Sequence, residues 1–501
     1  SWAYDPARGE VATKFAWQTA ATPDAAPTTA PITALYRHQW LHTDAPLVPT
    51  LTYVSPRGAM KLAVATEVTT RLRYDGVMPF LPLVDSAGPS GKTALFDHVD
   101  RAWRRGALFP LGMDGKKDSY WAGKSLGRNA ILVHLADQAG HTRARADLLR
   151  AVQNELEDWL DGQAPNLFYY DRTWRTLIGL PQGYESGTQL NDHHFHYGYF
   201  IFAAATVAHF DPTWAARANY GEAIELLIRD AASWDRSDER FPFLRNFDAY
   251  AGHSWANGPA LFAHGNNEES SSEDVNFAVG AILWGAATGD MKIRDLGIFL
   301  HANLTAAIDQ YWFDVDRAVF PKGFDRQAVG IVWGDGSRYE TWFDPSPIYI
   351  HGINLLPITG GSLYLGRRPA YVKRNWDALV AANRGEPLQW RDVLWMYVAL
   401  GDAEGAARRW RDQHEFTPEF GNSIAAVDHW IRTLGVAGTL DGEITADAPT
   451  AFALRLGQTR TYLGYNPTAQ ATTVRFSDGQ TLAVPARSYA HHRRTLDGSP
   501  R

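Results

Sequence analysis

Cysteine is absent from this 501-residue chain, as are several other features that would direct its interpretation. Without cysteine there are no disulfides, no thiolate nucleophile and no cysteine-ligated zinc or iron, although the cellular compartment stays undecided. No apolar run reaches about 18 residues, the length that a membrane-spanning helix needs. There is no long basic stripe, and a net charge of -7 with a pI near 6.2 argues against nucleic-acid binding. These absences favour a globular chain with an uncharged partner.

Aromatic residues, in contrast, are abundant. The sequence contains 19 Trp, 21 Tyr and 23 Phe, more than a core of this size needs. Amphipathic rings suit the apolar faces of sugars, which are bound by stacking together with hydrogen bonds. The composition therefore points towards a carbohydrate as the partner.

The residue pattern divides the chain into three regions. Residues 1–85 are rich in Val, Thr and aromatics, with a turn at "PRG" (56–58), and are predicted to form strands. Residues 86–435 show helical periodicity in roughly a dozen segments separated by Gly, Pro and Asp. Residues 436–501 return to short strands, with "TTVRF" and "TLAVPA" flanking the hairpin turn "SDGQ". The sequence thus predicts a multidomain, mainly α protein.

The sequential pairing of the helical segments predicts an (α/α)6 toroid, or barrel, with an inner and an outer layer of helices. No clear sequence repeat supports this arrangement. We expect residues 86–435 to form this barrel as the main domain, because a chain of this length exceeds one ordinary core and needs a large domain with smaller satellites. The C-terminal strands are expected to pack on the barrel as a small β appendage.

The stretch "NDHHFHYGYF" (191–200) places three histidines and an acid beside an apolar helical segment. One interpretation is a metal site built from His193, His194 and His196. No HExxH or comparable motif accompanies them, however, and a metal site needs three or four converging ligands. The other interpretation is a sugar-binding wall in which Asp192, desolvated among aromatics, keeps its proton near neutral pH and acts as a general acid.

A second cluster of titratable residues lies in "HGNNEESSSEDVNFAVGAILWG" (264–285). If its apolar part is a helix, Glu269, Glu273 and Asn276 lie about one turn apart near one face. The bland interpretation is that these acids and the serines at 270–272 only cap a helix and face solvent. Against it, asparagines and serines surround the acids in place of Lys or Arg, and crowded carboxylates raise one another's pKa. Such a cluster is more often a site.

Five strings together resemble glycoside hydrolase family 81, the endo-β-1,3-glucanases or laminarinases. They are "NDHHFHYGYFIFAAA", "FPFLRNFDAYAGHSWANG", "NNEESSSEDVNFAVG", "IHGINLLPITGGSLYLG" and "FYYDRTWRTLIGLP", and the resemblance extends from about residue 34 to residue 400. It implies an N-terminal β-sandwich and a linking α/β region joined to an (α/α)6 barrel. It also implies hydrolysis of β-1,3-glucan with inversion, without a metal or other cofactor.

The resemblance assigns roles to individual residues. It implies that Asp192 is the general acid, Glu269 the general base and Glu273 the carboxylate that supports the base, with His196 beside the acid. Two features differ from the family pattern. Glu268 stands where Gln is expected, which places a third acid near the base. The chain also begins too late for a complete family β-sandwich, so that residues 1–85 would form only part of one.

Further residues are predicted to bind glucose units of the substrate. Several lie in Gly- and Asp-rich loops such as "AGHSWANG" and "VWGDGSRYETW", where aromatic side chains are more accessible than in a core. The predicted substrate-binding residues are His194, His196, Tyr197, Tyr199, Tyr250, His253, Trp255, Asn267, Glu268, Trp333, Trp342 and His351.

The combined hypothesis is an exported, monomeric endo-β-1,3-glucanase that acts on glucan polysaccharide and its oligosaccharides. Export is suggested by Ser1 in place of an initiator methionine, consistent with a signal segment removed upstream. Two alternatives stay open at this point: a carbohydrate-binding protein without catalysis, and a metal-dependent or lyase-type polysaccharide enzyme that uses the histidines. Unpaired carboxylates argue against the first, because a neutral sugar does not require them.

Overall fold

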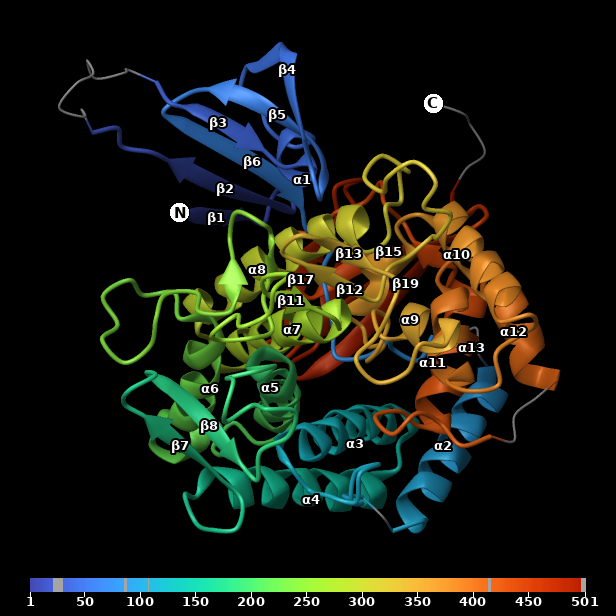
Figure 1. Cartoon of the computed structure of the whole chain (residues 1–501). Coiled ribbons are helices and arrows are strands. Elements are labelled where there is room, and N and C mark those ends of the chain that lie inside the picture. Colours follow the sequence, from blue (N-terminus) through green and yellow to red (C-terminus); the bar gives the residue numbers. More distant parts are fainter. Residues whose placement is uncertain (21–29, 85–87, 107, 413–415, 497–501) are drawn as a thin grey trace.

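The computed structural model describes residues 1–20, 30–84, 88–106, 108–412 and 416–496. Figure 1 shows the N-terminal strands projecting from one side of a large helical body, against which the C-terminal strands are packed. Strand-rich segments therefore flank a helical middle, which is the order that the sequence predicts. Among the described residues, no helix is both long and apolar enough to cross a membrane.

The N-terminal region contains two three-stranded sheets. The first has the order β1-β2-β6 and the second the order β3-β5-β4, all antiparallel. Leu35, Ala63 and Val68, one from each of three strands, form a small core between the sheets. The predicted "PRG" turn is confirmed, because Ser55 pairs with Gly58 across it. The elements are β1 (Trp2–Asp5), β2 (Glu10–Ala16), β3 (Ile32–Leu35), α1 (Arg37–Trp40), β4 (Leu47–Ser55), β5 (Gly58–Val64) and β6 (Glu67–Arg73).

The helical body begins at Gly88 and its last helix ends at Ala437, close to the predicted limits of the helical region. Its helices are α2 (Gly88–Arg104), α3 (Ser119–Ala139), α4 (Thr142–Leu160), α5 (His193–Phe210), α6 (Glu222–Ala232), α7 (Ser271–Thr288), α8 (Met291–Tyr311), α9 (Pro347–Gly352), α10 (Pro369–Ala382), α11 (Arg391–Ala399), α12 (Ala403–Asp412) and α13 (Ile424–Ala437), with the short helical turns η2 (Arg217–Gly221) and η3 (Ser362–Gly366).

Two kinds of helix alternate along much of this body. α3, α5 and α7 are buried over nearly their whole length, as expected for helices that are apolar on all sides. α4 buries a single face that includes Leu148, Val152, Leu156 and Trp159, and α4 packs on α3. α5 packs between α3 and α7, and the approach to α7 requires a glycine, since a Cβ on Gly198 would lie 3.0 Å from the Cα of Phe277.

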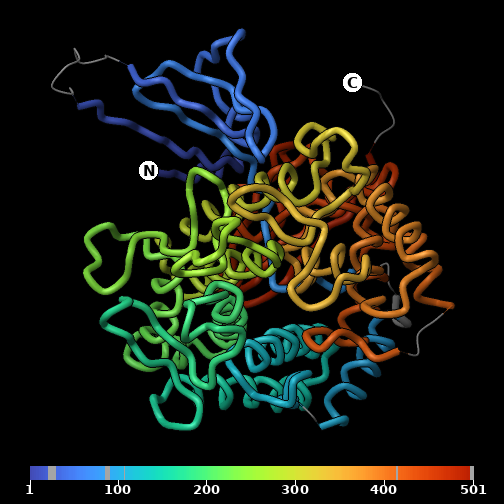
Figure 2. The backbone as a smooth tube through the Cα atoms, in the orientation of Figure 1, coloured from blue at the N-terminus to red at the C-terminus, as the bar shows by residue number. Residues whose placement is uncertain are grey.

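The order of contacts follows the sequence around the body. α6 packs on α5, α8 on α7, α10 on α9 and α11, and α12 on α11 and α13. α13 contacts α2 and α3, so the last helix lies beside the first ones. In Figure 2 the cyan, green, yellow and orange parts of the chain follow one another round the body, and the orange part returns next to the blue α2.

The C-terminal strands share the main core with the helices. The four-stranded antiparallel sheet has the order β14-β15-β16-β19, and one of its faces contributes Phe452, Leu454, Leu463 and Tyr465 to that core. The predicted hairpin at "SDGQ" is confirmed by the pairing of β17 with β18. The elements are β14 (Thr439–Leu440), β15 (Ala451–Leu456), β16 (Thr459–Asn466), β17 (Thr472–Arg475), β18 (Thr481–Val484) and β19 (Ser488–Thr495).

Short strands also occur between the helices, where the sequence pattern did not predict them. β7 and β8 form a hairpin, β9 pairs with β10, and β11, β12 and β13 form a small sheet. The last two groups lie in the loops that precede α7 and α9, next to the acidic segment. Their bounds are β7 (Leu167–Asp171), β8 (Thr176–Leu180), β9 (Phe247–Asp248), β10 (His253–Ser254), β11 (Asn267–Glu268), β12 (Ile331–Trp333) and β13 (Gly336–Arg338).

Candidate active site

The two predicted clusters of titratable residues lie at the N-terminal ends of two adjacent buried helices. Asp192 is the residue before α5, and Glu269 and Ser270 directly precede α7. The interpretation in which the serines at 270–272 cap α7 does not hold for Ser270, because its hydroxyl donates to the Ile353 carbonyl (3.0 Å) and makes no cap hydrogen bond. Glu269 lies outside the helix, so it does not share a helical face with Glu273 and Asn276 as predicted.

Two backbone hydrogen bonds through Ala256 hold the two clusters together. The Asp192 amide donates to the Ala256 carbonyl (3.0 Å), and the Ala256 amide donates to the Asn267 carbonyl (2.8 Å). The segments that carry Asp192 and Asn267 are therefore separated in space only by the backbone at Ala256. Backbone hydrogen bonds of this kind fix the relative positions of two side chains more firmly than loop contacts alone.

Asp192 has an unusual backbone conformation and an unusual protonation preference. Its φ of 59° lies in the left-handed region, which costs a residue other than glycine about 1–3 kcal/mol and is concentrated at functional sites. The side chain is half-buried and accepts a hydrogen bond from Asn191 Nδ2 (2.7 Å). Burial first, and then the nearby Glu268, Glu269 and Glu273, raise the pKa of Asp192 well above its usual value. A carboxyl in this state can donate a proton at neutral pH.

Glu269 is also half-buried, and its environment prepares it for proton exchange near neutrality. Burial, together with a smaller contribution from Glu273, raises its pKa to about 7, although the Trp342 amide opposes the shift by donating to Oε1 (2.8 Å). Trp342 is anchored in turn, since its indole Nε1 donates to Asn267 Oδ1 (3.2 Å) while 56% of the residue stays exposed. Glu269 thus has one oxygen fixed beside an accessible aromatic ring.

Glu273 lies in the first turn of α7 and is buried. Its Oε1 accepts a hydrogen bond from the Tyr199 hydroxyl (2.6 Å). Burial raises the pKa of Glu273, and the cation of Lys124 opposes this shift. Lys124 is itself buried and pairs with Glu419 (2.6 Å). Glu273 is therefore held by the Tyr199 hydroxyl near a buried ammonium group.

Glu268, the acid that stands where glutamine is expected, faces His194. His194 Nε2 lies 2.8 Å from Glu268 Oε1, and both side chains are fully buried. Burial raises the pKa of Glu268 well above its usual value and lowers the pKa of His194 to about 4. We infer that the pair is uncharged, with protonated Glu268 donating to the imidazole. The second oxygen, Glu268 Oε2, has no hydrogen-bond partner among the described residues.

One group of side chains could hold a metal ion. His194, Glu268 and Asp274 are all buried, and each offers a ligand atom within 4.8 Å of the others. Asp274 Oδ2 also accepts the Ser254 amide (3.1 Å), and burial raises the pKa of Asp274 to about 7. Only one of the three clustered histidines belongs to this group. Within the described part of the chain it is the single set of at least three such ligands.

The other two histidines have separate partners. His193 Nε2 lies 2.7 Å from the Ser186 carbonyl, and its Nδ1 lies 2.9 Å from Asp230 Oδ2. Asp230 also forms an ion pair with Arg245 (2.7 Å). His196 Nδ1 lies 2.8 Å from the Ser119 hydroxyl. Since each histidine faces a different direction, the three do not converge on one ion.

Several predicted sugar-binding residues are buried and leave no ring face open to a sugar. Tyr197 is fully buried, with its hydroxyl donating to the Leu177 carbonyl (2.8 Å), and His253 is equally buried, accepting from Arg57 Nη1 (2.7 Å). Burial leaves no ring face exposed for stacking at Tyr197, His253 and three further predicted residues, whose binding of glucose through hydrogen bonds stays a prediction. The three are Tyr199 (1% exposed), Trp333 (5%) and His351 (2%).

The remaining predicted residues differ in their distance from the acids. Trp342 and Asn267 contact Glu269 or each other, as described above. Trp255 is half-exposed, and its ring lies 4.6 Å from that of His253. Tyr250 donates to the Ala34 carbonyl (2.7 Å) and packs in the small core of the N-terminal sheets, so the structure places it with those sheets.

Sequence reasoning missed the polar residues that neighbouring helices and loops bring to the acids. Lys124, Tyr120 and Ser119 come from the first turns of α3, and Glu419 comes from the loop before α13. A signal for Lys124 was present, because it is the only charged residue in the apolar stretch "SYWAGKSLG" (119–127). A buried lysine needs an acid partner, which directs attention to such positions.

Comparison with known proteins matches this chain to one family. The model of the glycosyl hydrolase family 81 C-terminal domain matches residues 112–426. A glucan endo-1,3-beta-D-glucosidase of Thermobifida fusca is 44% identical over 489 residues, which is 96% of this chain and 63% of the relative. One of Acetivibrio thermocellus is 42% identical over 463 residues, 92% of this chain and 59% of the relative. This chain thus spans about three fifths of the length of these curated relatives.

A solved structure agrees with these sequence matches. A mutant of a family 81 glycoside hydrolase from Clostridium thermocellum superposes with a TM-score of 0.93 at 40% sequence identity, covering 98% of this chain and 68% of the other. The N-terminal sheets, the helical body and the C-terminal sheet are therefore shared with that protein.

Proposed function

Because this chain belongs to glycosyl hydrolase family 81, we propose that it hydrolyses β-1,3-glucan internally, with inversion at the anomeric carbon. The observation that carries the proposal is the position of Asp192 and Glu269 on two segments that backbone hydrogen bonds through Ala256 hold together. Each of the two carboxyl groups is half-buried, and each has a raised pKa. The curated relatives named as glucan endo-1,3-beta-D-glucosidases support the choice of substrate.

In the proposed reaction, the two carboxyl groups act on opposite sides of the scissile bond. Asp192 gives its proton to the glycosidic oxygen as the bond between that oxygen and the anomeric carbon breaks. A water molecule attacks the anomeric carbon and loses a proton to Glu269. An inverting enzyme separates its two carboxyl groups by about 6.5–9.5 Å so that this water fits. The released sugar then has the α configuration, and proton transfer back through solvent restores both groups.

Glu273 and its neighbours support the base. Glu273 is fixed by Tyr199, and its negative charge raises the pKa of Glu269. In this proposal Glu273 orients the base and sets its charge but does not accept the proton from water. Lys124 acts through Glu273, because its cation limits how far the pKa of Glu273 rises.

The aromatic side chains that stay accessible are the proposed first contacts for the sugar. Trp342 is the better placed of these, since its backbone amide donates to the base and the residue is 56% exposed. Half-exposed Trp255 is the second. A sugar face stacked on such a ring is stabilised by the apolar area that is removed from water, at about 25 cal/mol per Å².

We also infer that the helices close into an (α/α)6 toroid. The alternation of buried and one-faced helices and the contacts of α13 with α2 and α3 support this arrangement. It would form the catalytic domain, flanked by the N-terminal β region and the C-terminal β appendage. Export from the cell is proposed as well, because a polymeric cell-wall glucan lies outside it.

The decisive test is the stereochemistry of the products. Linear β-1,3-glucan would be digested in an NMR tube and the anomeric protons followed from the first minutes. We expect new reducing ends that appear as the α anomer and then mutarotate. Initial release of the β anomer would contradict inversion, and no release of reducing ends would favour the carbohydrate-binding alternative. Activity that survives dialysis against a chelator would show that the group His194, Glu268 and Asp274 does not supply a catalytic metal.

A further inference from the structure

The turn "PRG" (56–58) of the N-terminal sheets brings a buried arginine against the helical body, and no role has been given to it above. Arg57 is only 6% exposed. Its turn is fixed locally, since the Ser55 hydroxyl donates to the Gly58 carbonyl (2.9 Å) and accepts from the Arg57 amide (3.1 Å). The turn also approaches the body closely, because a Cβ on Gly58 would lie 3.1 Å from the Cα of Val319.

The guanidinium group of Arg57 is surrounded by uncharged rings. Its Nη1 donates to His253 Nε2 (2.7 Å), and the other ring nitrogen, His253 Nδ1, lies 2.7 Å from the Ser254 carbonyl. Because a carbonyl only accepts, Nδ1 carries the proton of the imidazole and Nε2 is the acceptor. The guanidinium group also lies over three aromatic rings, those of Trp255 (5.2 Å), Tyr311 (5.4 Å) and Tyr36 (5.9 Å).

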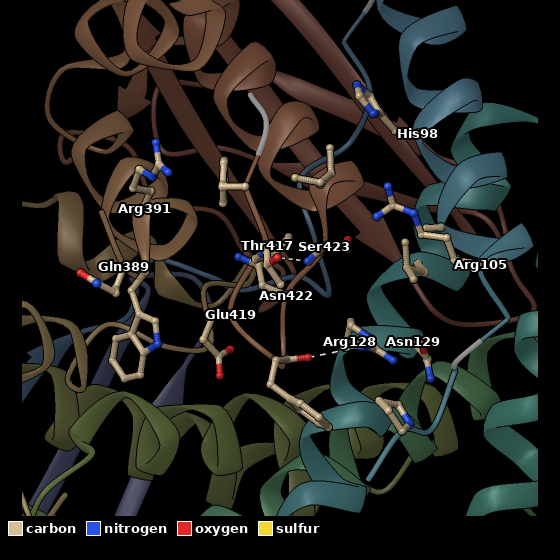
Figure 3. A pocket seen from close by; sticks show the side chains of 18 of the residues that line it. His98, Arg105, Arg128, Asn129, Gln389, Arg391, Thr417, Glu419, Asn422 and Ser423 are labelled. Carbon is tan, nitrogen blue, oxygen red and sulfur yellow. Dashed lines mark hydrogen bonds between the residues drawn. The ribbon is translucent and has the colours of Figure 1, made fainter. Parts of the chain in front are cut away.

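Arg128 shows the more usual arrangement of an arginine in this protein. In the wall of the cavity that Figure 3 shows, it donates to the main-chain carbonyls of Leu108 (2.6 Å) and Phe420 (3.4 Å). Arg57, in contrast, forms no ion pair with a carboxylate of the described residues and meets an imidazole and aromatic rings instead. Burying a cation without a carboxylate partner costs free energy. Stability alone therefore does not account for the position of Arg57.

The segment that Arg57 contacts is the one that holds the acid and the base together. His253 and Trp255 are followed directly by Ala256. The Ala256 carbonyl accepts from the Asp192 amide, and its own amide donates to the Asn267 carbonyl. Arg57 thus brings a contact from the N-terminal sheets to residues 253–256, next to the two backbone hydrogen bonds.

We propose that Arg57 is a positioning residue through which the N-terminal sheets keep Asp192 and Glu269 aligned for hydrolysis. This inference rests on the proposed function and deepens it, because it makes the sheets part of the catalytic arrangement. Arg57 acts through His253 and Trp255, which it fixes, and not by contact with the substrate. A displacement of about 1 Å caused by a distant change can slow a reaction on the order of 100-fold. Loss of Arg57 should therefore lower kcat more than it weakens substrate binding.

The first test compares Arg57→Met with the wild-type protein on laminarin. We expect kcat to fall about 10- to 100-fold, with KM within about threefold of the wild-type value. The loss should be equal at every pH, because the guanidinium group faces an imidazole and aromatic rings. Arg57→Lys keeps the charge and a donor for His253 but not the planar group, so it should lose only about threefold in kcat.

Arg37→Met is the matched control. Arg37 joins the same N-terminal region to the helical body at other residues, where it donates to Gln310 (2.7 Å) and pairs with Asp316 (3.2 Å). Its loss weakens the same boundary without touching residues 253–256, so kcat should stay within about twofold of the wild-type value.

Amide hydrogen exchange, followed by NMR, tests the alignment without turnover. The Asp192 and Ala256 amides donate the two backbone hydrogen bonds, so both should exchange about tenfold faster in Arg57→Met and at the wild-type rate in Arg37→Met. Arg57→Lys, with a smaller increase, supplies the same measurement if Arg57→Met does not fold.

Four results would overturn the proposal. They are unchanged exchange of both amides, equal losses of kcat in Arg57→Met and Arg37→Met, a loss that lies in KM alone, and a displaced limb of the pH profile. Wild-type protein that releases no reducing ends would overturn the proposed function instead, and the exchange rates would still decide whether Arg57 fixes this segment.

Discussion

The N-terminal ends of α5 and α7 both gather titratable side chains, but the two groups differ in how their charges are treated. At α5, His193 and His196 each have a defined partner, and burial lowers the pKa of both, so they stay uncharged. At α7, burial and mutual repulsion raise the pKa of Glu268 and Glu269. Asp192 belongs by sequence to the first group and by its raised pKa to the second.

We propose that this difference separates side chains that build the site from side chains that react in it. A buried neutral imidazole with hydrogen-bond partners contributes to stability and needs no further role. A partly exposed carboxyl group with a raised pKa can still exchange a proton near neutral pH. Variants of the first kind should therefore affect folding, and variants of the second kind should affect chemistry.

Removal of the proton donor should have the largest effect. Asp192→Asn keeps the shape of the side chain but cannot protonate the glycosidic oxygen, so kcat on unactivated glucan should fall about 10²–10⁴-fold or more. Binding of laminarihexaose, followed by calorimetry, should stay close to that of the wild type. Near-normal turnover of laminarin by this variant would remove Asp192 from the mechanism.

Removal of the base should be nearly as damaging but open to rescue. Glu269→Gln should also lose about 10²–10⁴-fold in kcat, because the water is no longer deprotonated. Azide can occupy the place of the water and attack without a base, so it should restore turnover and yield a glycosyl azide. Glu273→Gln should be impaired without such rescue. If the azide effect appears in Glu273→Gln and not in Glu269→Gln, the two roles must be exchanged.

A histidine variant tests the other half of the comparison. His193→Ala leaves the Ser186 carbonyl without its imidazole partner and removes one of the partners of buried Asp230, which should lower the free energy of unfolding by about 2–4 kcal/mol. The activity of the molecules that remain folded at low temperature should change little. His264→Ala removes an exposed imidazole paired with Asp335 and should change stability by less than about 0.5 kcal/mol. Equal melting temperatures for both variants would contradict the structural role of His193.

Much of this site could be predicted from the sequence because local strings carry it. The acids in "NNEESSSED" and the acid and histidines in "NDHHFHYG" are contiguous, so their types and spacing identify them without a fold. The helices α5 and α7 follow from apolar runs, and the C-terminal hairpin from its turn residues. The apolar residues around α5 also indicate a helix buried on all sides, and on that ground Tyr197 and Tyr199 belong to the core.

The rest depends on contacts between distant segments. Ser270 would cap a helix in isolation, but its hydroxyl contacts Ile353 in a loop that the sequence cannot bring near. Lys124 matters only because α3 packs on α5, which places its cation near Glu273. Trp390 gives no local signal at all. Its left-handed backbone conformation, directly before α11, exists only in the folded chain.

Lys124 offers a smaller effect on the pH profile. Its cation lowers the pKa of Glu273, so Lys124→Met should raise that pKa further and leave Glu273 with less negative charge near neutral pH. The pKa of Glu269, which the charge of Glu273 raises, should then fall, and the acidic limb of kcat/KM should move to lower pH. The double variant with Glu419→Gln removes the opposing charge as well and should shift the limb less than the single variant. A change in kcat that is equal at every pH would mean that Lys124 supports only the packing.

The smallest expected effect belongs to Glu268, whose charge state links the two groups through His194. Glutamine can still donate to His194 Nε2, so Glu268→Gln should keep most of the activity. The pKa of Glu268 is raised in the folded protein, so the folded state binds the proton more tightly than the unfolded state does. Stability should therefore fall as pH rises from the unfolded pKa of about 4.5 towards the folded value, and the variant should escape this loss.

The melting temperatures of wild type and Glu268→Gln should therefore nearly coincide at pH 4.5 and separate as pH rises, with the variant higher by about 1–3 °C at pH 8. Glu443→Gln, an exposed acid on the C-terminal region, is the control and should show no such divergence. A variant that is less stable than wild type at pH 8 would mean that Glu268 is ionised and held by a charged His194. The negative charge of Glu268 would then be neutralised by an ion pair with His194, and not by a proton on the carboxyl group.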